Sequence, residues 1–460
     1  MSVNIHWFRK DLRLSDNPAL CAAAKTGAVL PLYILDPDHL EGLGSASRVW
    51  LCHSLHQLKG SLNNNLLILA GRPLDILPKL VTETNAAHVT WTRRYDPDGI
   101  AQDQTLKSQL ETQGTRVLSL NGSLLWEPWE VQKPDQTPYR VFTPFFKRGC
   151  TAAPLPRHPL PAPILEFAEF SQHSKADLSK LLPNTDWHQS VTSHWQPGEC
   201  GAAQSLCTFI ERALRGYKKG RDFPAHQATS RLSPHLHFGE ISPNQIWHAV
   251  AALPASEDTT HFKSELAWRE FSYHLLFRNP NLHSRNLNQK FDTFPWREAP
   301  EDLRKWTRGQ TGFPIIDAGM RELWQTGYMH NRVRMIVASF LTKNLMIHWR
   351  HGLAWFHDTL FDADPANNAA SWQWVAGSGA DAAPYFRIFN PVTQARKFDM
   401  DGTYIRTYVP ELAHLDAKHI HAPWEASEEV QLSLPGHYPP PMIDLKDSRE
   451  RALAAYSALP

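Results

Sequence analysis

Long apolar runs are missing from this sequence of 460 residues. No stretch is long enough to cross a bilayer as a helix. The first residues, MSVNIHWFRKDLRLSD, carry charges where a signal peptide needs an apolar core. We therefore expect a cytoplasmic protein without membrane contacts.

Cysteine is also scarce. The five cysteines are scattered and never form a C-x-x-C pair, so neither a disulfide framework nor a zinc site is expected. The 24 histidines do not change this, because pairs such as His235/His237 and His348/His351 lack cysteine or carboxylate partners at ligand spacing. No metal centre is predicted.

The chain has no excess of charge of either sign. With 47 basic and 46 acidic residues its net charge is +1, so the field of the whole protein predicts no nucleic acid partner. Such a partner would have to be held by a local patch. The run RALRGYKKGRDF around Tyr217 is a basic stripe of this kind, although a solvated face is the usual meaning of such a run.

Up to about residue 130, β-prone runs alternate with helical periodicity. The runs are VNIHWF, AVLPLYILD, NLLILAG, HVTWT and RVLSL, and the helical stretches include Ala46–Leu62 and Ile100–Leu110. This alternation predicts a Rossmann-like parallel sheet in an α/β domain. Ser15 or Asp16 can cap the first helix, and Pro18 fits its first turn.

A glycine-rich dinucleotide fingerprint is absent after the first strand. Ligands of parallel sheets nevertheless lie beyond the carboxyl ends of the strands. We therefore expect any ligand of this domain near RRYDPDG and LDPDHL.

The remainder divides into a connector and a helical region. Five prolines in PLPRHPLPAP, residues 154–163, exclude helix and sheet interior and favour an extended surface segment. From about residue 200, apolar residues recur at spacings of three and four, which is typical of helices. The predicted organisation is an α/β domain over 1–130, a connector over 131–199 and a larger all-α domain over 200–460.

One predicted helix carries a face with unusual chemistry. Glu265, Trp268 and Arg269 fall at helical spacing, together with Ser272. A carboxylate, an indole and a guanidinium make a poor core face, so a binding surface is one interpretation. An exposed helix with an ion pair and one stray tryptophan explains the pattern equally well.

A second predicted helix places Asn331, Arg334 and Met335 on one face inside an otherwise apolar segment. An arginine in such surroundings needs a carboxylate or a bound anion. Asp362 and Asp364, in FDADPANN, are the obvious carboxylates.

A third segment is suited to phosphate. Thr229, Ser230 and Ser233 place hydroxyls and backbone amides around Arg231 immediately before a helical run. Hydroxyl donors and the electrostatics of a helix start both favour an anion there. A serine-rich helix cap is the ordinary alternative.

Six motifs then follow one another in a recognisable order. They are GYKKGRDFPAHQATSRLS, ELAWREF, TGFPIIDAGMREL, MHNRVRMIVASFL, DADPANNAASWQW and YFRIFNPVTQARKFD. With HWFRKDLRLSDNPAL at the amino terminus, they make essentially the whole chain resemble the DNA photolyase and cryptochrome family, and within it the microbial cyclobutane pyrimidine dimer photolyases. The resemblance implies an α/β antenna-chromophore domain and a helical catalytic domain that binds FAD.

The resemblance also implies which residues contact FAD. Asn368 would face flavin N5, where an uncharged amide suits the anionic hydroquinone that is the active cofactor, because a carboxylate would repel it. Asp362 would pair with Arg334 beside the isoalloxazine ring. The full set that the resemblance implies is Tyr217, Thr229, Ser230, Arg231, Leu232, Ser233, Arg269, Arg334, Asp362, Asp364 and Asn368.

Three further sets of residues come from the resemblance. The pocket for a flipped pyrimidine dimer would be formed by the catalytic residues Glu265, Trp268, Asn331, Met335 and Trp374. An electron-transfer chain to the flavin would run through Trp372, Trp349 and Trp296. The DNA backbone would contact Arg221, Arg332, Gln394 and Arg396.

The implied function is light-dependent DNA repair. Photoexcited reduced FAD would pass an electron to the dimer, the cyclobutane ring would split, and the electron would return. UV-damaged DNA would be the partner, with the dimer flipped into the pocket, no obligate protein partner and a monomeric enzyme. A cryptochrome-type blue-light receptor is one alternative, although such proteins commonly have an extended carboxyl-terminal tail and this chain stops at Pro460. A (6-4) photolyase is the other, although it would carry paired histidines where Asn331 and Met335 stand.

A second, antenna chromophore is also implied. Asp98 and Gly99 occupy the place where folate-binding relatives carry an Asn-Glu pair, and Arg48 matches an arginine near the deazaflavin of other relatives. We therefore expect 8-hydroxy-5-deazaflavin in preference to methenyltetrahydrofolate. A plain surface loop and an empty pocket are the alternatives.

Overall fold

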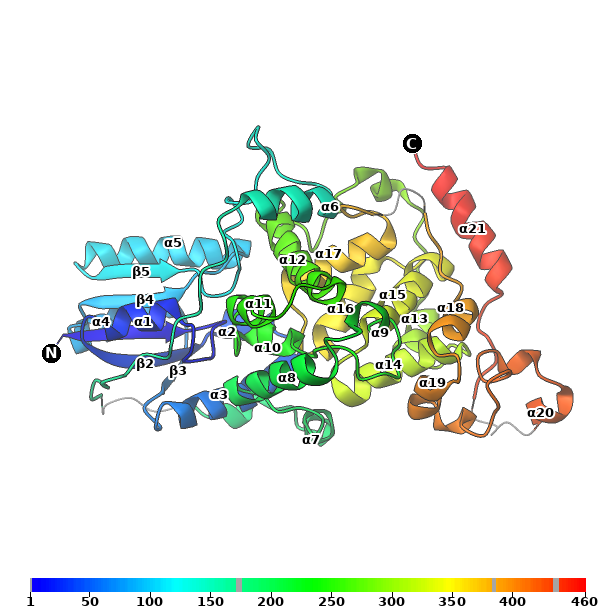
Figure 1. Cartoon of the computed structure of the whole chain (residues 1–460), viewed down its shortest axis with the longest axis horizontal. Coiled ribbons are helices and arrows are strands. Elements are labelled where there is room, and N and C mark those ends of the chain that lie inside the picture. The colour runs from blue at the N-terminus through cyan, green and yellow to red at the C-terminus, as the bar shows by residue number, and fades with distance from the viewer. Residues whose placement is uncertain (1, 171–175, 383–385, 433–437) are drawn as a thin grey trace. The chain divides into compact units, whose positions relative to one another are not determined.

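The computed structural model describes residues 2–170, 176–382, 386–432 and 438–460 (Figure 1). The chain forms two compact units. Unit 1 comprises Met1–Leu214, Ser230–Pro280 and Phe361–Asp364, and unit 2 comprises Arg215–Thr229, Asn281–Leu360 and Pro365–Pro460. The predicted functional division at residues 130 and 200 stays a prediction.

Unit 1 contains a five-stranded parallel sheet, as the sequence predicts. Its strands are β1 (Val3–Phe8), β2 (Ala28–Leu35), β3 (Leu67–Ala70), β4 (His88–Thr92) and β5 (Arg116–Leu120). Their order is β3-β2-β1-β4-β5, so the connections reverse direction between β1 and β4. That reversal leaves a crevice beyond the carboxyl ends of the strands, which is where doubly wound sheets bind ligands.

Both faces of the sheet are covered by helices. One face packs against apolar residues of α1 (Pro18–Ala24) and α3 (Ser45–Ser61). The other face packs against α4 (Pro73–Thr84) and α5 (Pro97–Thr112). Because the strands are buried on both sides, they read as apolar runs and not as an alternating pattern.

The start of α1 differs from the sequence prediction in one residue. Asn17, and not Ser15 or Asp16, caps the helix by accepting a hydrogen bond from the Leu20 amide at 3.0 Å. Asp16 instead has a left-handed backbone, and its buried carboxylate accepts hydrogen bonds from Arg157. Proline at position 18 opens the helix, as predicted.

Most of the remaining elements are helices. Unit 1 also contains α2 (Pro37–Glu41), α6 (Phe142–Pro144), α7 (Trp187–Thr192), α8 (Glu199–Arg212), α10 (Ser233–Phe238), α11 (Pro243–Ala251) and α12 (Glu257–Arg278). Unit 2 contains α9 (Tyr217–Gly220), α13 (Pro300–Thr307), α14 (Pro314–Thr326), α15 (Asn331–Ser339), α16 (Trp349–Thr359), α17 (Pro365–Ala376), α18 (Pro391–Phe398), α19 (Thr403–Tyr408), α20 (Glu428–Leu432) and α21 (Leu445–Ser457). The short 3-10 or π-helical turns are η1 (Phe145–Cys150), η2 (Leu178–Leu181), η3 (Gln289–Thr293), η4 (Phe340–Asn344), η5 (Pro410–Leu412) and η6 (Pro423–Glu425).

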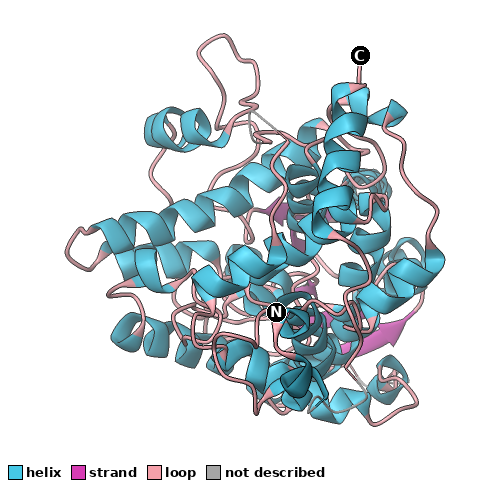
Figure 2. Cartoon of the chain, turned by 90° about the vertical axis from the view of Figure 1, so that its right-hand side faces the viewer, coloured by secondary structure: helices cyan, strands magenta, loops and turns pink. Residues whose placement is uncertain are grey.

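The fold class is therefore confirmed: a parallel α/β sheet and a region of helices. In the part of the chain that the structure describes, the strands all belong to unit 1. Figure 2 shows the strands in magenta among a larger number of helices in cyan. None of the helices among these residues is long and apolar enough to span a membrane. The same residues contain no cluster of histidine, cysteine or carboxylate side chains that could hold a metal ion.

Candidate active site and chromophore pocket

The segment predicted to bind phosphate forms a turn with an unusual backbone. Arg231 has a φ of 52°, in the left-handed region, and Leu232 follows in the right-handed helical region. Successive residues of this kind turn their backbone amides toward one side and make an anion-binding nest. The exposed guanidinium of Arg231 lies 4.1 Å from the ring centre of Trp195. Thr229 lies in unit 2, while Ser230 to Ser233 lie in unit 1.

Asp364 lies at the centre of a buried polar cluster in unit 1. The hydroxyl of Tyr273 donates a hydrogen bond to its carboxylate, and Nδ1 of His237 lies 3.9 Å away. Burial alone would raise the pKa of Asp364, but His237 and the charge of Lys10 more than offset it, so that pKa lies well below its usual range. Burial lowers the pKa of Lys10, against the attraction of Asp364.

Helix α12 carries the predicted face with Glu265, Trp268 and Arg269, and these side chains contact other side chains of unit 1. Trp268 stacks on Phe142, with ring centres 3.7 Å apart and planes 10° apart. Arg269 donates to the carbonyl of Ser123 at 2.8 Å, and its guanidinium lies 5.0 Å from the ring centre of Tyr273. Glu265 is half-buried and lies 3.8 Å from His261. The ring of Trp268 is therefore held in a defined stack, and the binding role of this face stays a prediction.

The neighbour of Arg269 is a buried carboxyl group that the sequence analysis did not single out. Glu270 accepts hydrogen bonds from the backbone amides of Leu125 and Trp126 at 2.9 and 3.4 Å. Burial raises the pKa of Glu270 to about 7, although Arg269 and these amides act in the opposite direction. Glu270 thereby ties the segment after β5 to α12.

Helix α15 of unit 2 carries the other predicted pocket residues. Asn331 is its first residue and is exposed, and Met335 follows one turn later and is half-buried. Arg332 pairs with Asp222 at 2.7 Å, and its guanidinium lies 4.4 Å from the ring centre of Phe398. Arg334 donates through Nε to the carbonyl of Met329 at 2.7 Å.

The predicted pair of Asp362 and Arg334 joins residues of different units. Asp362 is half-buried in unit 1, at the segment that also carries Asp364. The pairing stays a prediction.

Helix α17 carries the amide predicted to face the flavin. Nδ2 of Asn368 donates to the carbonyl of Leu353 at 3.2 Å, which directs the amide so that Oδ1 is its remaining acceptor. On the same helix, Trp372 is buried, whereas Trp374 is half-buried and donates to the carbonyl of Asp381 at 2.9 Å. Residues two apart on a helix point to different sides, which explains their different surroundings.

The three tryptophans of the predicted electron-transfer chain lie in unit 2. The ring of Trp372 packs on the backbone of Gly352, where a Cβ atom would have no room. Gly352 follows Trp349 by one turn of α16, so Trp349 and the contact with Trp372 share a helix face. The imidazole of His348 lies 5.4 Å from Trp349 and 4.8 Å from Trp296, measured between ring centres.

The cations predicted to contact DNA already have partners within unit 2. Arg396, on α18, forms an exposed ion pair with Glu425 at 2.8 Å. The guanidinium of Arg221 lies 5.4 Å from the ring centre of the buried Tyr217. Gln394 is half-buried on α18. A phosphate bound here would have to share Arg396 with Glu425.

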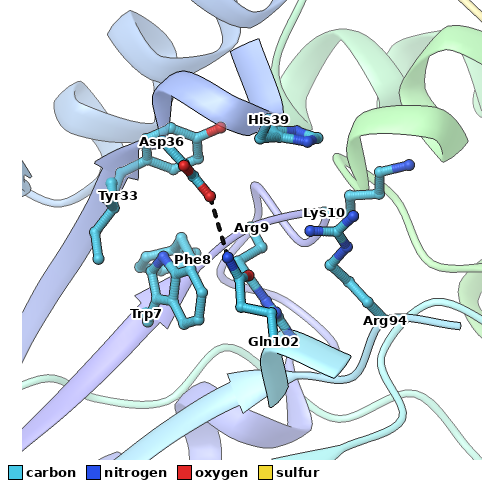
Figure 3. A pocket seen from close by; sticks show the side chains of 10 residues that line it. Trp7, Phe8, Arg9, Lys10, Tyr33, Asp36, His39, Arg94 and Gln102 are labelled. Atoms are coloured by element: carbon cyan, nitrogen blue, oxygen red, sulfur yellow. Dashed lines mark hydrogen bonds between the residues drawn. The ribbon is translucent and has the colours of Figure 1, made fainter. Parts of the chain in front are cut away.

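A pocket in unit 1 opens at the carboxyl ends of β1 and β2 (Figure 3). Gln102 donates to Asp36 across it at 3.1 Å. Burial, together with the charges of Arg94 and Lys10, lowers the pKa of His39 to about 3, so this imidazole is neutral at physiological pH. The pocket is lined by Trp7, Phe8, Arg9, Lys10, Tyr33, Ile34, Asp36, His39, Arg94 and Gln102.

The position of this pocket agrees with the sequence prediction, since Asp36 belongs to LDPDHL and Arg94 to RRYDPDG. Gly99 leaves the space that the Arg94 side chain fills, because a Cβ atom on Gly99 would meet that side chain. Asp98 is exposed. Arg48 does not line this pocket and instead donates to the carbonyl of Leu43 at 2.9 Å.

The sequence analysis missed several residues of these sites. Tyr273 could have been found, because it follows Arg269 by four residues on the same predicted helix. Lys10 and His237 could not, because only the fold brings them from distant parts of the chain to Asp364. Phe142 comes from the connector, where no motif marks it.

Comparison with known proteins gives matches along nearly the whole chain. A family model described as DNA photolyase matches residues 4–164, and one described as the FAD binding domain of DNA photolyase matches residues 262–458. A deoxyribodipyrimidine photo-lyase of Agrobacterium fabrum is 51% identical, with 99% of this chain and 98% of that protein covered. Cryptochrome-1 of Arabidopsis thaliana is 36% identical, with 99% and 70% covered. The crystal structure of a class III photolyase from Agrobacterium tumefaciens superposes with a TM-score of 0.95 at 50% identity, with 100% of this chain and 98% of that chain covered.

Proposed function

This chain belongs to the DNA photolyase and cryptochrome family, and we propose that it is a light-driven lyase that splits cyclobutane pyrimidine dimers in DNA. The observation that carries the lesion specificity is the pair Asn331 and Met335, one turn apart on α15. An amide can hydrogen-bond a pyrimidine edge, and a thioether gives an adaptable apolar surface. Neither group donates a proton readily at neutral pH, which repair of a (6-4) adduct would require.

The residues present fit FAD. The backbone nest at Arg231 and Leu232 suits a diphosphate, and the Asn368 amide, directed by Leu353, presents an acceptor without charge. When bound and reduced, FAD supplies the light-driven electron. We propose that it is held without a covalent bond by the eleven residues that the resemblance implies, with Asp362 and Arg334 as an ion pair.

The side chains of the protein then position the dimer and stabilise charge on it. Glu265 hydrogen-bonds the dimer and stabilises charge that develops on it, and Trp268, held by its stack on Phe142, provides a rigid wall. We assign to Trp374 a surface on which the damaged bases pack. Arg221, Arg332, Gln394 and Arg396 contact the backbone of a strand from which the lesion is flipped.

We propose further that the enzyme acts as a monomer in the cytoplasm, without an obligate protein partner. Its antenna region is residues 1–130, its connector 131–199 and its catalytic region 200–460. The photoreduction chain runs from Trp372 through Trp349 to Trp296. The packing of Trp372 on Gly352 supports this order, because Gly352 lies one turn after Trp349 on α16.

The function is tested with two oligonucleotides, one bearing a thymine cyclobutane dimer and one a (6-4) photoproduct. We expect the reduced enzyme under blue light to restore the first and leave the second unchanged, as measured by chromatography of the digested strand. Glu265→Gln should lower the quantum yield of dimer splitting about tenfold, which is the effect of weakening one hydrogen bond to a charged group. Restoration of the (6-4) site with the dimer untouched would refute the lesion assignment. Failure to restore either would favour the cryptochrome-type receptor.

We propose that the pocket of unit 1 holds the antenna chromophore. Aromatic rings of Trp7 and Tyr33 suit a planar ligand, and Lys10 and Arg94 suit an anionic one. An 8-hydroxy-5-deazaflavin has both properties. Asp98 and Gly99 at the start of α5 support the same preference, since neither provides the Asn-Glu pair of folate-binding relatives.

The antenna proposal predicts which ligand binds and which arginine holds it. We expect 8-hydroxy-5-deazaflavin to bind the FAD-loaded enzyme and to transfer excitation energy, and Arg94→Gln to weaken binding about tenfold through loss of a charge-assisted hydrogen bond. Fluorescence titration measures both. Arg93→Gln is the matched control, because each arginine is paired with a carboxylate, Arg93 with Glu127 and Arg94 with Asp96, and of the two only Arg94 lines the pocket. Tight binding of methenyltetrahydrofolate instead, or equal binding by the Arg94 variant, would contradict the proposal.

A further inference from the structure

The middle tryptophan of the proposed chain has a built hydrogen-bond acceptor. Nε1 of Trp349 donates to Oδ1 of Asn286 at 2.8 Å, and both side chains are buried. Nδ2 of Asn286 donates in turn to Oδ1 of Asp292 at 2.7 Å. Asp292 is exposed on η3. An indole, an amide and a carboxylate therefore form one continuous hydrogen-bonded series.

The other two indoles of the chain differ. Nε1 of Trp372 and Nε1 of Trp296 are buried, and neither has a hydrogen-bond partner among the residues that the structure describes. Within that part of the protein, Trp349 is thus the member of the chain whose N–H group is held by an acceptor.

The imidazole ring of His348, next to Trp349, carries no charge. His348 lies between Trp349 and Trp296, and its Nδ1 accepts from the Arg350 amide at 3.1 Å. Burial, with the charges of Arg350 and His351, lowers the pKa of His348 to about 4. The imidazole is therefore neutral at pH 7, and it does not repel a positive charge on either indole.

We propose that Asn286, polarised by Asp292, tunes Trp349 for electron transfer by stabilising its one-electron-oxidised form. This inference rests on the proposed tryptophan chain. Trp372 gives one electron to the photoexcited oxidised flavin and is then re-reduced by one electron from Trp349. Trp349 is then re-reduced by one electron from Trp296. A thiol in solution finally returns one electron to Trp296 and releases its own proton to water, so electrons and protons balance.

The stabilisation is selective for the oxidised indole. Loss of an electron puts positive charge on the ring and makes its N–H group a far stronger donor, so the bond to Asn286 strengthens at that moment. The bond from Asn286 to Asp292 makes the amide oxygen a better acceptor, because neighbouring hydrogen bonds polarise one another. An amide oxygen is too weak a base to remove the proton. Trp349 therefore keeps its positive charge until Trp296 neutralises it.

Two variants test this proposal in the FAD-loaded enzyme. Asn286→Leu removes the acceptor at similar volume, and we expect photoreduction with a thiol donor to slow about threefold to tenfold, the effect of one hydrogen bond on a barrier. Asp292→Asn keeps a hydrogen-bond acceptor for Asn286 and removes only the charge, so a smaller slowing is expected. Because Asp292 is exposed, this second variant stays informative if the first fails to fold.

The matched control is Asn344→Leu. Asn344 is an equally buried asparagine of unit 2 whose Nδ2 bonds to Ser448 at 3.0 Å. This variant should lose stability without slowing photoreduction. Trp349→Phe, measured in parallel, separates two kinds of failure. If Trp349→Phe reduces at the wild-type rate, the tryptophan chain itself is wrong, and if it alone is slow, the tuning role of Asn286 is wrong.

A structural readout is independent of turnover. In protein labelled with ¹⁵N at the tryptophan indoles, the Trp349 N–H proton should resonate downfield and exchange slowly in the wild type. Asn286→Leu should move that signal upfield, and Asp292→Asn should move it in the same direction by less. An unchanged Trp349 signal in both variants would overturn the proposed hydrogen-bonded series.

Discussion

Replacement of Trp372 by phenylalanine is expected to slow light-driven reduction of the bound flavin by roughly a hundredfold or more, which corresponds to about 2.7 kcal/mol on the barrier. Trp372 is proposed as the indole nearest the flavin, which gives its electron to the flavin directly. A phenyl ring is much harder to oxidise than an indole. The variant should still repair dimers once its FAD has been reduced chemically. Absorbance of the flavin under continuous blue light, with a thiol donor, measures the rate.

The control for this variant is an equally buried tryptophan beside it. Trp306 lies 6.2 Å from Trp372 between ring centres and donates to the backbone carbonyl of Val337 at 3.1 Å. We expect Trp306→Phe to lose stability by a few kcal/mol, because a buried ring is shortened, and to keep a near-normal rate of photoreduction. Equal slowing in the two variants would indicate that the electron-transfer path includes Trp306. A normal rate in Trp372→Phe would refute the proposed chain.

The sheet could be predicted from the sequence because its local and global signals agree. Each strand is a short apolar run bounded by turn residues, and all five predicted runs became strands. The capping residue of α1 was harder, because Ser15, Asp16 and Asn17 are all good caps and only tertiary partners decide among them. Asp16 is engaged by Arg157, which comes from the connector, so Asn17 is left to cap the helix.

The resemblance assigns candidate roles to single residues, and these roles stay predictions, but the contacts that support the residues could not be predicted. The family's motifs single out Trp268 and Trp349. They do not identify Phe142 or Asn286, which give those rings a stack and a hydrogen-bond acceptor. Such contacts join segments that are far apart in the sequence, and no local periodicity encodes them.

Asp364→Asn is expected to destabilise unit 1 strongly. The change keeps the shape of the side chain but removes a buried negative charge that faces Lys10 and receives the Tyr273 hydroxyl. The ammonium group of Lys10 then loses the carboxylate that attracts it most, and Asp96 offsets only part of its charge. We expect the free energy of unfolding at pH 7 to fall by about 2–4 kcal/mol, somewhat less than for a fully buried pair because Lys10 is half-buried.

The pH dependence of this loss follows from the direction of the pKa shift. The folded-state pKa of Asp364 lies well below the value of about 3.9 that an unfolded aspartate has, so its contribution is complete above about pH 5. As the pH falls below about 4, the unfolded chain takes up the proton first, and the contribution is progressively lost. The difference between wild type and Asp364→Asn should therefore be constant from pH 5 to 8 and shrink toward pH 3.5. Urea unfolding at each pH measures it.

Two comparisons decide whether loss of the buried charge causes the loss of stability in Asp364→Asn. Asp38→Asn breaks a pair with Arg72 in which both side chains are mostly exposed, at 3.3 Å, and should cost less than about 1 kcal/mol at every pH. Lys10→Met removes the cation that Asp364 balances, so the double variant Lys10→Met/Asp364→Asn should be less destabilised than the sum of the two single variants. If the single effects simply add, Lys10 and Asp364 do not interact, and the low pKa of Asp364 must come from its other partners, His237, Tyr273 and Arg269.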